Sequence, residues 1–131
     1  MTADYHLHSC FSGDSETPTE DIIKKGLERG LSLMCMTEHL DLDYPYEDVS
    51  FDLDAEAYVR EMRRLQDVYR NRLELRIGVE IGLQPHLGDA YRTWLSDKSF
   101  DFLKMCIRDS TETSLRSVVS VIIYIFNNRG D

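Results

Sequence analysis

Positive charge is scarce in this chain of 131 residues. Lysine and arginine together number 15, against 24 aspartate and glutamate residues, and the formal net charge at pH 7 is -9. Proteins that bind nucleic acids usually present a basic surface, because Lys and Arg replace the counterions that a phosphate backbone releases. The charge balance therefore argues against a nucleic-acid partner, while an acidic surplus suits a protein that holds cations.

Cysteine is also rare, and Cys10, Cys35 and Cys106 lie far apart in the chain. Because no Cys-x-x-Cys pair is present, neither a disulfide framework nor a zinc knuckle is predicted. The N-terminal residues lack the basic stretch of a signal peptide. The most apolar segment, residues 118–126, is far shorter than the ~20 residues of a membrane span. We therefore expect a cytoplasmic protein with no membrane partner.

Strands and helices alternate in the predicted fold. Apolar stretches predict strands near residues 4–9, 31–39, 75–82 and 100–103, with amphipathic helices between them. Thr17 and Glu20, three residues apart, predict a capping box at the start of the first helix, with Pro18 at its first position. Such alternation implies right-handed βαβ units and a parallel sheet, an α/β fold whose chemistry collects at the carboxyl ends of the strands.

Two histidines, His6 and His8, stand one residue apart in the first predicted strand. Side chains at this spacing point to the same face of a strand, so the two imidazoles can converge. An isolated pair of this kind is more often a solvent-facing pair on an ordinary strand. Metal binding is favoured here because His39 and Glu80 also fall at or near strand ends, with Glu80 on the face opposite an apolar row.

Imidazole and carboxylate groups are ligands of divalent transition metals. Asp14 in the loop after the first strand adds a fifth candidate, although its Ser-Gly-Asp-Ser context is equally that of an ordinary turn. Glu38 either orients the neighbouring His39 or is an exposed carboxylate. The candidate metal ligands are thus His6, His8, Asp14, His39 and Glu80.

Three motifs, in this order and spacing, resemble those of the polymerase and histidinol phosphatase (PHP) superfamily: DYHLHS with SGD at residues 4–14, TEH at 37–39 and GVEIG at 78–82. The segments YE at 46–47 and GLQPH at 82–86 resemble the histidinol-phosphatase branch. The resemblance extends from residue 4 to about residue 103.

This resemblance implies an incomplete, distorted (β/α)7 barrel of parallel strands with outer helices. It also implies up to three divalent ions of zinc, manganese or iron, and hydrolysis of L-histidinol phosphate, a small-molecule phosphate monoester of histidine biosynthesis. By the resemblance, His6 and His8 bind one ion, Glu80 bridges it to a second, and Asp14 and His39 hold the third. His6, His8 and Glu80 would then act in catalysis through metal-activated water.

The family pattern is not followed after residue 103. The family continues with Gly-Ser-x-His and further histidines, whereas the last histidine here is His86. The segment KMCIRDS at 104–110 instead resembles translated sequencing-adaptor read-through. We therefore predict that residues 1–103 are the N-terminal part of a PHP domain, that residues 104–131 are an artefactual tail, and that the chain is inactive by itself.

Two alternatives stay open. One is a phosphoesterase or exonuclease of the same superfamily acting on nucleotides, against which the net charge weighs. The other is a non-catalytic metal-binding fragment. An amidohydrolase barrel also begins with His-x-His, but the TEH and GVEIG segments fit that class poorly. The sequence predicts no particular oligomeric state.

Overall fold

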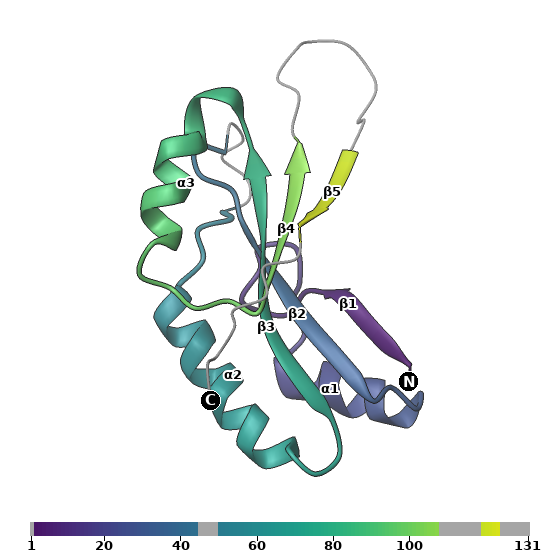
Figure 1. Cartoon of the computed structure of the whole chain (residues 1–131). Coiled ribbons are helices and arrows are strands. Elements are labelled where there is room, and N and C mark those ends of the chain that lie inside the picture. Colours follow the sequence, from purple (N-terminus) through teal and green to yellow (C-terminus); the bar gives the residue numbers. More distant parts are fainter. Residues whose placement is uncertain (1, 45–49, 108–118, 124–131) are drawn as a thin grey trace, which may run out of the picture.

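The computed structural model describes residues 2–44, 50–107 and 119–123 of the chain. These residues form a twisted sheet in the order β1-β2-β3-β4-β5 (Figure 1). The first four strands pair in parallel, and β5 is antiparallel to β4. The strand bounds are β1 Ala3–Leu7, β2 Leu33–Leu40, β3 Glu74–Leu83, β4 Phe102–Ile107 and β5 Val119–Ile123.

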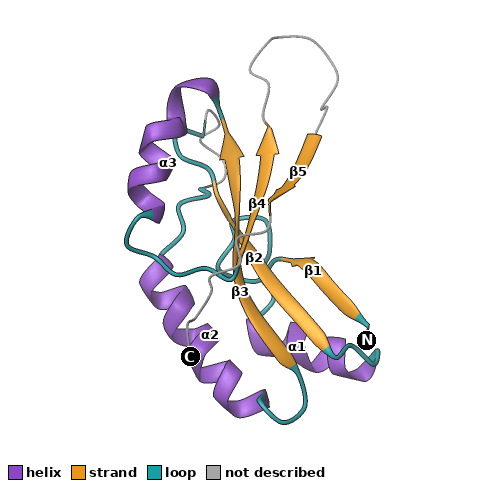
Figure 2. Ribbon diagram, viewed as in Figure 1, coloured by secondary structure: helices purple, strands orange, loops and turns teal. Residues whose placement is uncertain are grey.

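Helices connect the parallel strands, as the alternating pattern predicts (Figure 2). They are α1 Thr19–Glu28, α2 Ala55–Tyr69 and α3 Gly88–Leu95, the last preceded by a short 3-10 turn, η1 Pro85–Leu87. In this chain the four parallel strands and their helices form a curled half-barrel, so the predicted incomplete α/β barrel is confirmed. In the part of the chain that the structure describes, no helix is long and apolar enough to cross a membrane.

The core lies between one face of the sheet and the helices. The alternating residues Leu75, Ile77, Val79 and Ile81 of β3 are all nearly inaccessible to solvent. They belong to one apolar cluster with buried side chains of all three helices, including Ile23, Tyr58, Met62, Leu65 and Tyr91. Because successive strand residues face opposite sides, this packing leaves Glu80 on the other face of the sheet.

The pairing of β2 with β3 is fixed by close backbone contacts around Gly78. A Cβ atom at this position would lie 2.8 Å from the Met36 carbonyl oxygen, so no larger residue fits without movement. The buried hydroxyl of Tyr58 lies within hydrogen-bond distance of the same Met36 carbonyl and of the Gly78 carbonyl, at 3.1 and 2.9 Å. This register places His39 directly beside Glu80.

The predicted capping box at the start of α1 is wrong. The helix begins at Thr19 with Pro18 as its N-cap, and no side chain caps its first turn. Thr17 lies one position too early and instead accepts a backbone hydrogen bond from Cys10 through its carbonyl, at 2.9 Å. Glu20 turns outward to Arg64 and to the hydroxyl of Tyr69. Tertiary partners have therefore replaced the local pairing that the spacing indicates.

Strand β4 crosses the predicted domain boundary at residue 103. Its pairing with β3 runs without interruption from Phe102 to Ile107, and β5 lies within the predicted tail. Residues 108–118 and 124–131 of that tail lie outside the described residues, as do residues 46–47, which carry part of the resemblance. The division into 1–103 and 104–131 stays a prediction.

Candidate metal centre

A row of side chains crosses the sheet near the carboxyl ends of its parallel strands. His39 of β2 is paired with Glu80 of β3, and Glu80 is paired in turn with Lys104 of β4. Residues in register on neighbouring strands project from the same face, so these three side chains are neighbours. His6 lies in β1 and His8 just after it, beside an irregularity in the pairing between Asp4 and Leu7. The five predicted ligands therefore come together from three strands and one loop.

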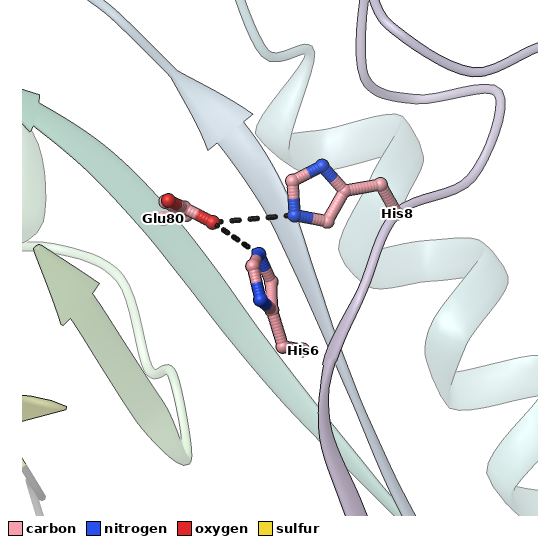
Figure 3. Close-up of side chains that lie close together, drawn as sticks. All are labelled: His6, His8 and Glu80. Atoms are coloured by element: carbon pink, nitrogen blue, oxygen red, sulfur yellow. Dashed lines mark ion pairs between the residues drawn. The ribbon is translucent and has the colours of Figure 1, made fainter. Parts of the chain in front are cut away.

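The first group of potential ligands consists of His6, His8 and Glu80. Both imidazoles point at one carboxylate oxygen, as Figure 3 shows. Oε2 of Glu80 lies 3.0 Å from Nε2 of His6 and 3.2 Å from Nε2 of His8. The Glu80 side chain is only 3% exposed, whereas that of His6 is 55% exposed. The group therefore combines the buried carboxylate of Glu80 with the solvent-accessible imidazole of His6.

The second group consists of His8, Asp14 and His39. Nδ1 of His8 lies 3.1 Å from Oδ2 of Asp14, and Nε2 of His39 lies 3.4 Å from the same oxygen. The rings of His8 and His39 meet edge to face with centroids 4.4 Å apart. His8 therefore belongs to both groups, through one ring nitrogen each. The described residues supply two groups, and the number of ions stays a prediction.

The donor atoms fit a divalent cation. Nε2 of His8 and Oε2 of Glu80 are buried, and neither has a hydrogen bond. Their 3.2 Å contact lacks the alignment of a hydrogen bond, although the opposite nitrogen of His8 contacts Asp14. When Asp14 accepts the Nδ1 proton, the Nε2 lone pair is directed at the carboxylate. Buried polar atoms are normally paired, so converging acceptor atoms indicate a place for a cation.

The charges around the centre shift its titrating groups in opposite directions. Burial would raise the pKa of Glu80, but its contacts with His8 and Lys104 and the charges nearby lower that pKa to about 2. Burial lowers the pKa of His6, and the charge of Lys104 lowers it further. For His8, burial is outweighed by the contact with Glu80 and the charge of Asp14, so its pKa is raised. The site around His8 is therefore electrically suited to a cation.

Glu38 anchors the loop that carries Asp14. It is fully buried, so the exposed alternative is wrong. Its carboxylate accepts hydrogen bonds from the backbone N–H of Ser9 at 2.9 Å and from the hydroxyls of Ser9 and Ser12, both at 2.6 Å. The Ser12 hydroxyl in turn accepts from the backbone N–H of His39 at 2.8 Å. Glu38 thus ties the loop after β1 to the end of β2, in support of the alternative in which it orients His39.

Lys104 is a member of the site that the sequence did not reveal. Its ammonium lies 2.8 Å from Oε1 of Glu80 and 2.8 Å from Nε2 of His6. A lysine within the apolar stretch FLKMCI at 102–107 was the available signal. Its importance depends on the β3–β4 register, which places it beside Glu80. His86, by contrast, lies in η1 and contacts Asp43 at 3.0 Å, in agreement with its interpretation as a residue at the start of a helix.

Comparison with known proteins agrees with this arrangement. Histidinol-phosphatase from Lactococcus lactis subsp. lactis is 33% identical over 100 residues, which are 76% of this chain and 36% of the relative. A probable histidinol-phosphatase from Clostridium acetobutylicum is 33% identical over 103 residues, or 79% of this chain and 38% of the relative. The chain therefore spans little more than a third of the length of these curated relatives.

A solved structure shows the same fold. The crystal structure of histidinol phosphate phosphatase from Lactococcus lactis, complexed with zinc, L-histidinol and phosphate, superposes with a TM-score of 0.74 at 30% identity. The match covers 78% of this chain and 38% of that protein. The sequence pattern of the PHP domain matches residues 4–118. The resemblance deduced from the three motifs is confirmed, and the chain belongs to the PHP domain family.

Proposed function

We propose that this chain carries part of the metal centre of a phosphatase that hydrolyses the phosphate monoester L-histidinol phosphate. The observation that carries the proposal is the convergence of His6 and His8 on one buried oxygen of Glu80. Asp14 and His39 extend the centre beyond His8. A plain structural role would not bring four strand-end or loop residues of this chemistry onto a shared histidine.

The chain's own residues would hold the cations and set their geometry. Glu80 is immobilised by burial, and Asp14 orients His8 so that its Nε2 faces Glu80. Divalent cations bound in such a centre activate water for attack and neutralise the charge that develops on phosphoryl oxygens. The carboxylates of Asp14 and Glu80, in a chain of net charge -9, would otherwise repel a phosphate dianion.

The substrate assignment is supported by relatives of similar sequence. The Lactococcus lactis phosphatase carries zinc, L-histidinol and phosphate in its crystal structure. Zinc is therefore the first metal to test, with manganese and iron next. A cytoplasmic location stays part of the proposal. We also propose that the protein has no nucleic-acid partner, because its acidic charge disfavours long nucleic acids.

Metal content and phosphate release, measured on the same preparation, test the proposal. The substrates would be L-histidinol phosphate and a dinucleotide. The full 131-residue chain would be compared with a chimaera that joins residues 1–103 to the remaining part of the Lactococcus lactis relative. We expect both proteins to bind zinc and only the chimaera to release phosphate, because the chain spans 36% of that relative. Comparable turnover by the 131-residue chain would contradict the predicted inactivity, and turnover of the dinucleotide alone would favour the nucleotide alternative.

A matched pair of histidine variants tests the ligand assignment. His8→Asn removes the residue shared by both groups, whereas His86→Asn removes an exposed histidine that contacts only Asp43 among the contacts described. We expect zinc binding to be lost in the first variant and kept in the second. Equal zinc content in the two variants would reject the centre.

A non-catalytic metal-binding role is the second candidate. It is favoured by the ammonium of Lys104, which lies 2.8 Å from Nε2 of His6 and from Oε1 of Glu80 within the first group. Bound zinc without turnover in the chimaera, under conditions in which the intact relative is active, would support this role over hydrolysis.

A further inference from the structure

Lys104 lies inside the candidate metal centre. Its side chain is only 7% exposed, and its position on β4 is paired directly with Glu80 on β3. The ammonium contacts Oε1 of Glu80 and Nε2 of His6, each at 2.8 Å. The second of these atoms is the one that His6 contributes to the first group of ligands.

These contacts use the electron pair that a metal ion would need. A lysine ammonium has three donors and no acceptor, so Nε2 of His6 accepts from it. The same nitrogen lies 3.0 Å from Oε2 of Glu80, another acceptor. The ammonium is therefore shared by Nε2 of His6 and Oε1 of Glu80, while Oε2 of Glu80 is left without a hydrogen bond. A zinc ion would need the Nε2 lone pair at ~2.0–2.1 Å, and the ammonium would have to withdraw.

Asp14 of the second group has different neighbours. Among the residues that the structure describes, no lysine or arginine forms an ion pair with Asp14, whose contacts are with His8 and His39. The two groups therefore differ in one respect that matters for cation binding. In the described part of the chain, the first group contains the ammonium of Lys104, whereas no lysine or arginine forms an ion pair with Asp14 of the second group.

We propose that Lys104 acts as a tethered cation that competes with a divalent ion for His6 and Glu80. The group of His8, Asp14 and His39 would then bind the first ion, and the group of His6, His8 and Glu80 would bind a second ion only weakly. This inference rests on the proposed metal centre. It goes further because it states that the group of His6, His8 and Glu80 binds a divalent ion weakly, and that Lys104 is the cause.

Removing the ammonium while keeping the side-chain volume is the direct test. Lys104→Met would be titrated with Co²⁺ by calorimetry, with the cobalt absorption spectrum as a second readout of imidazole ligation. We expect the unaltered chain to bind one ion tightly, and the variant to bind a second ion at least roughly tenfold more tightly than the unaltered chain. The repulsion between cations a few ångströms apart near a protein surface is larger than this change requires.

Two further variants isolate the cause. Lys104→Arg keeps the positive charge and is expected to keep weak binding of the second ion. Lys25→Met removes one charge from an exposed lysine that pairs with Glu28 on α1, and is expected to bind as the unaltered chain does. Thermal unfolding and far-UV circular dichroism would confirm that each variant is folded.

The outcomes separate the inference from the proposed function. Tight binding of two ions by the unaltered chain, or no gain in Lys104→Met, would overturn the role of Lys104 and leave the metal centre standing. An equal gain in Lys25→Met would also overturn it, because the effect would then be one of net charge. Absence of metal binding in every folded form would overturn the metal centre itself.

Discussion

The two halves of the candidate centre share His8 and have opposite surroundings. The half formed by His6 and Glu80 lies on strands β1 and β3 and faces the buried ammonium of Lys104. The half formed by Asp14 and His39 depends on a loop that the buried carboxylate of Glu38 holds in place. Ligand type is similar in both halves, so we propose that neighbours outside the ligand set determine which half binds a cation first.

Substitution of Glu80 tests the strand half and should have the largest effect. Glu80→Gln would leave the buried ammonium of Lys104 without its carboxylate, and breaking one partner of a buried ion pair costs about 3–5 kcal/mol. We expect a loss of this size in the free energy of unfolding, measured by urea denaturation of the metal-free chain.

A double variant tests whether the unpaired ammonium of Lys104 causes the loss of stability in Glu80→Gln. Glu80→Gln combined with Lys104→Met removes both charges together, and replacement of a buried pair by uncharged groups is much less costly than removal of one partner. The double variant should therefore be more stable than Glu80→Gln alone. If it were less stable, the ammonium would not be the group that suffers from the loss of Glu80.

Substitution of Glu38 tests the loop half and should have the next largest effect. Glu38→Gln would place an amide donor against groups that already donate, the N–H of Ser9 and the hydroxyls of Ser9 and Ser12. We expect a loss of about 1–3 kcal/mol in stability, since a buried group loses its partners. Metal affinity of the second group should fall by about 10- to 100-fold, because Glu38 supports its geometry.

The matched control for Glu38 is Glu56→Gln, at an exposed position in the first turn of α2. Calorimetric titration with Co²⁺ would compare the two variants with the unaltered chain. A fall in affinity that is equal in both variants would show that negative charge alone, rather than the anchored loop, supports the second group.

The sequence predicted the candidate ligands and did not reveal the charged groups that surround them. His6, His8 and Glu80 could be placed because alternation along a strand and the parallel order of strands determine which faces and ends meet. The sequence could not decide whether Glu38 is exposed or orients His39. Its buried carboxylate binds Ser9 and Ser12, which are 29 and 26 residues away in the chain. The sequence places Lys104 in the predicted tail, whereas the β3–β4 register pairs it with Glu80.

A change at the start of α2 should lower stability without distinguishing the two halves. The carboxylate of Asp54 accepts a hydrogen bond from the backbone N–H of Ala57 at 3.0 Å and caps the helix. Asp54→Ala should cost about 1 kcal/mol, measured by urea denaturation. Because α2 packs on the opposite face of the sheet, affinity for Co²⁺ should be unchanged. A selective loss at either group would mean that the centre responds to general loosening of the fold.

Titration of His6 and His8 with protons distinguishes the two halves of the centre without any substitution in the chain. In the metal-free chain, NMR signals of the imidazole ring of His8 should titrate with a midpoint above the usual pKa of 6.5, and those of His6 with a midpoint below it. For His8, the raised pKa means that its contribution to stability is present below pH 6.5 and is lost as the pH rises through the folded-state pKa. For His6, the lowered pKa means that its contribution is present above pH 6.5 and is lost as the pH falls through the folded-state pKa.

Lys104→Met should bring the two midpoints closer together. Burial is the first cause of the low pKa of His6, and the charge of Lys104 is the second, so removal of the ammonium should raise the His6 midpoint. The midpoint of His8, which is governed by Glu80 and Asp14 against its burial, should move less. A His6 midpoint that does not respond would show that the ammonium does not influence the electrostatics of the strand half.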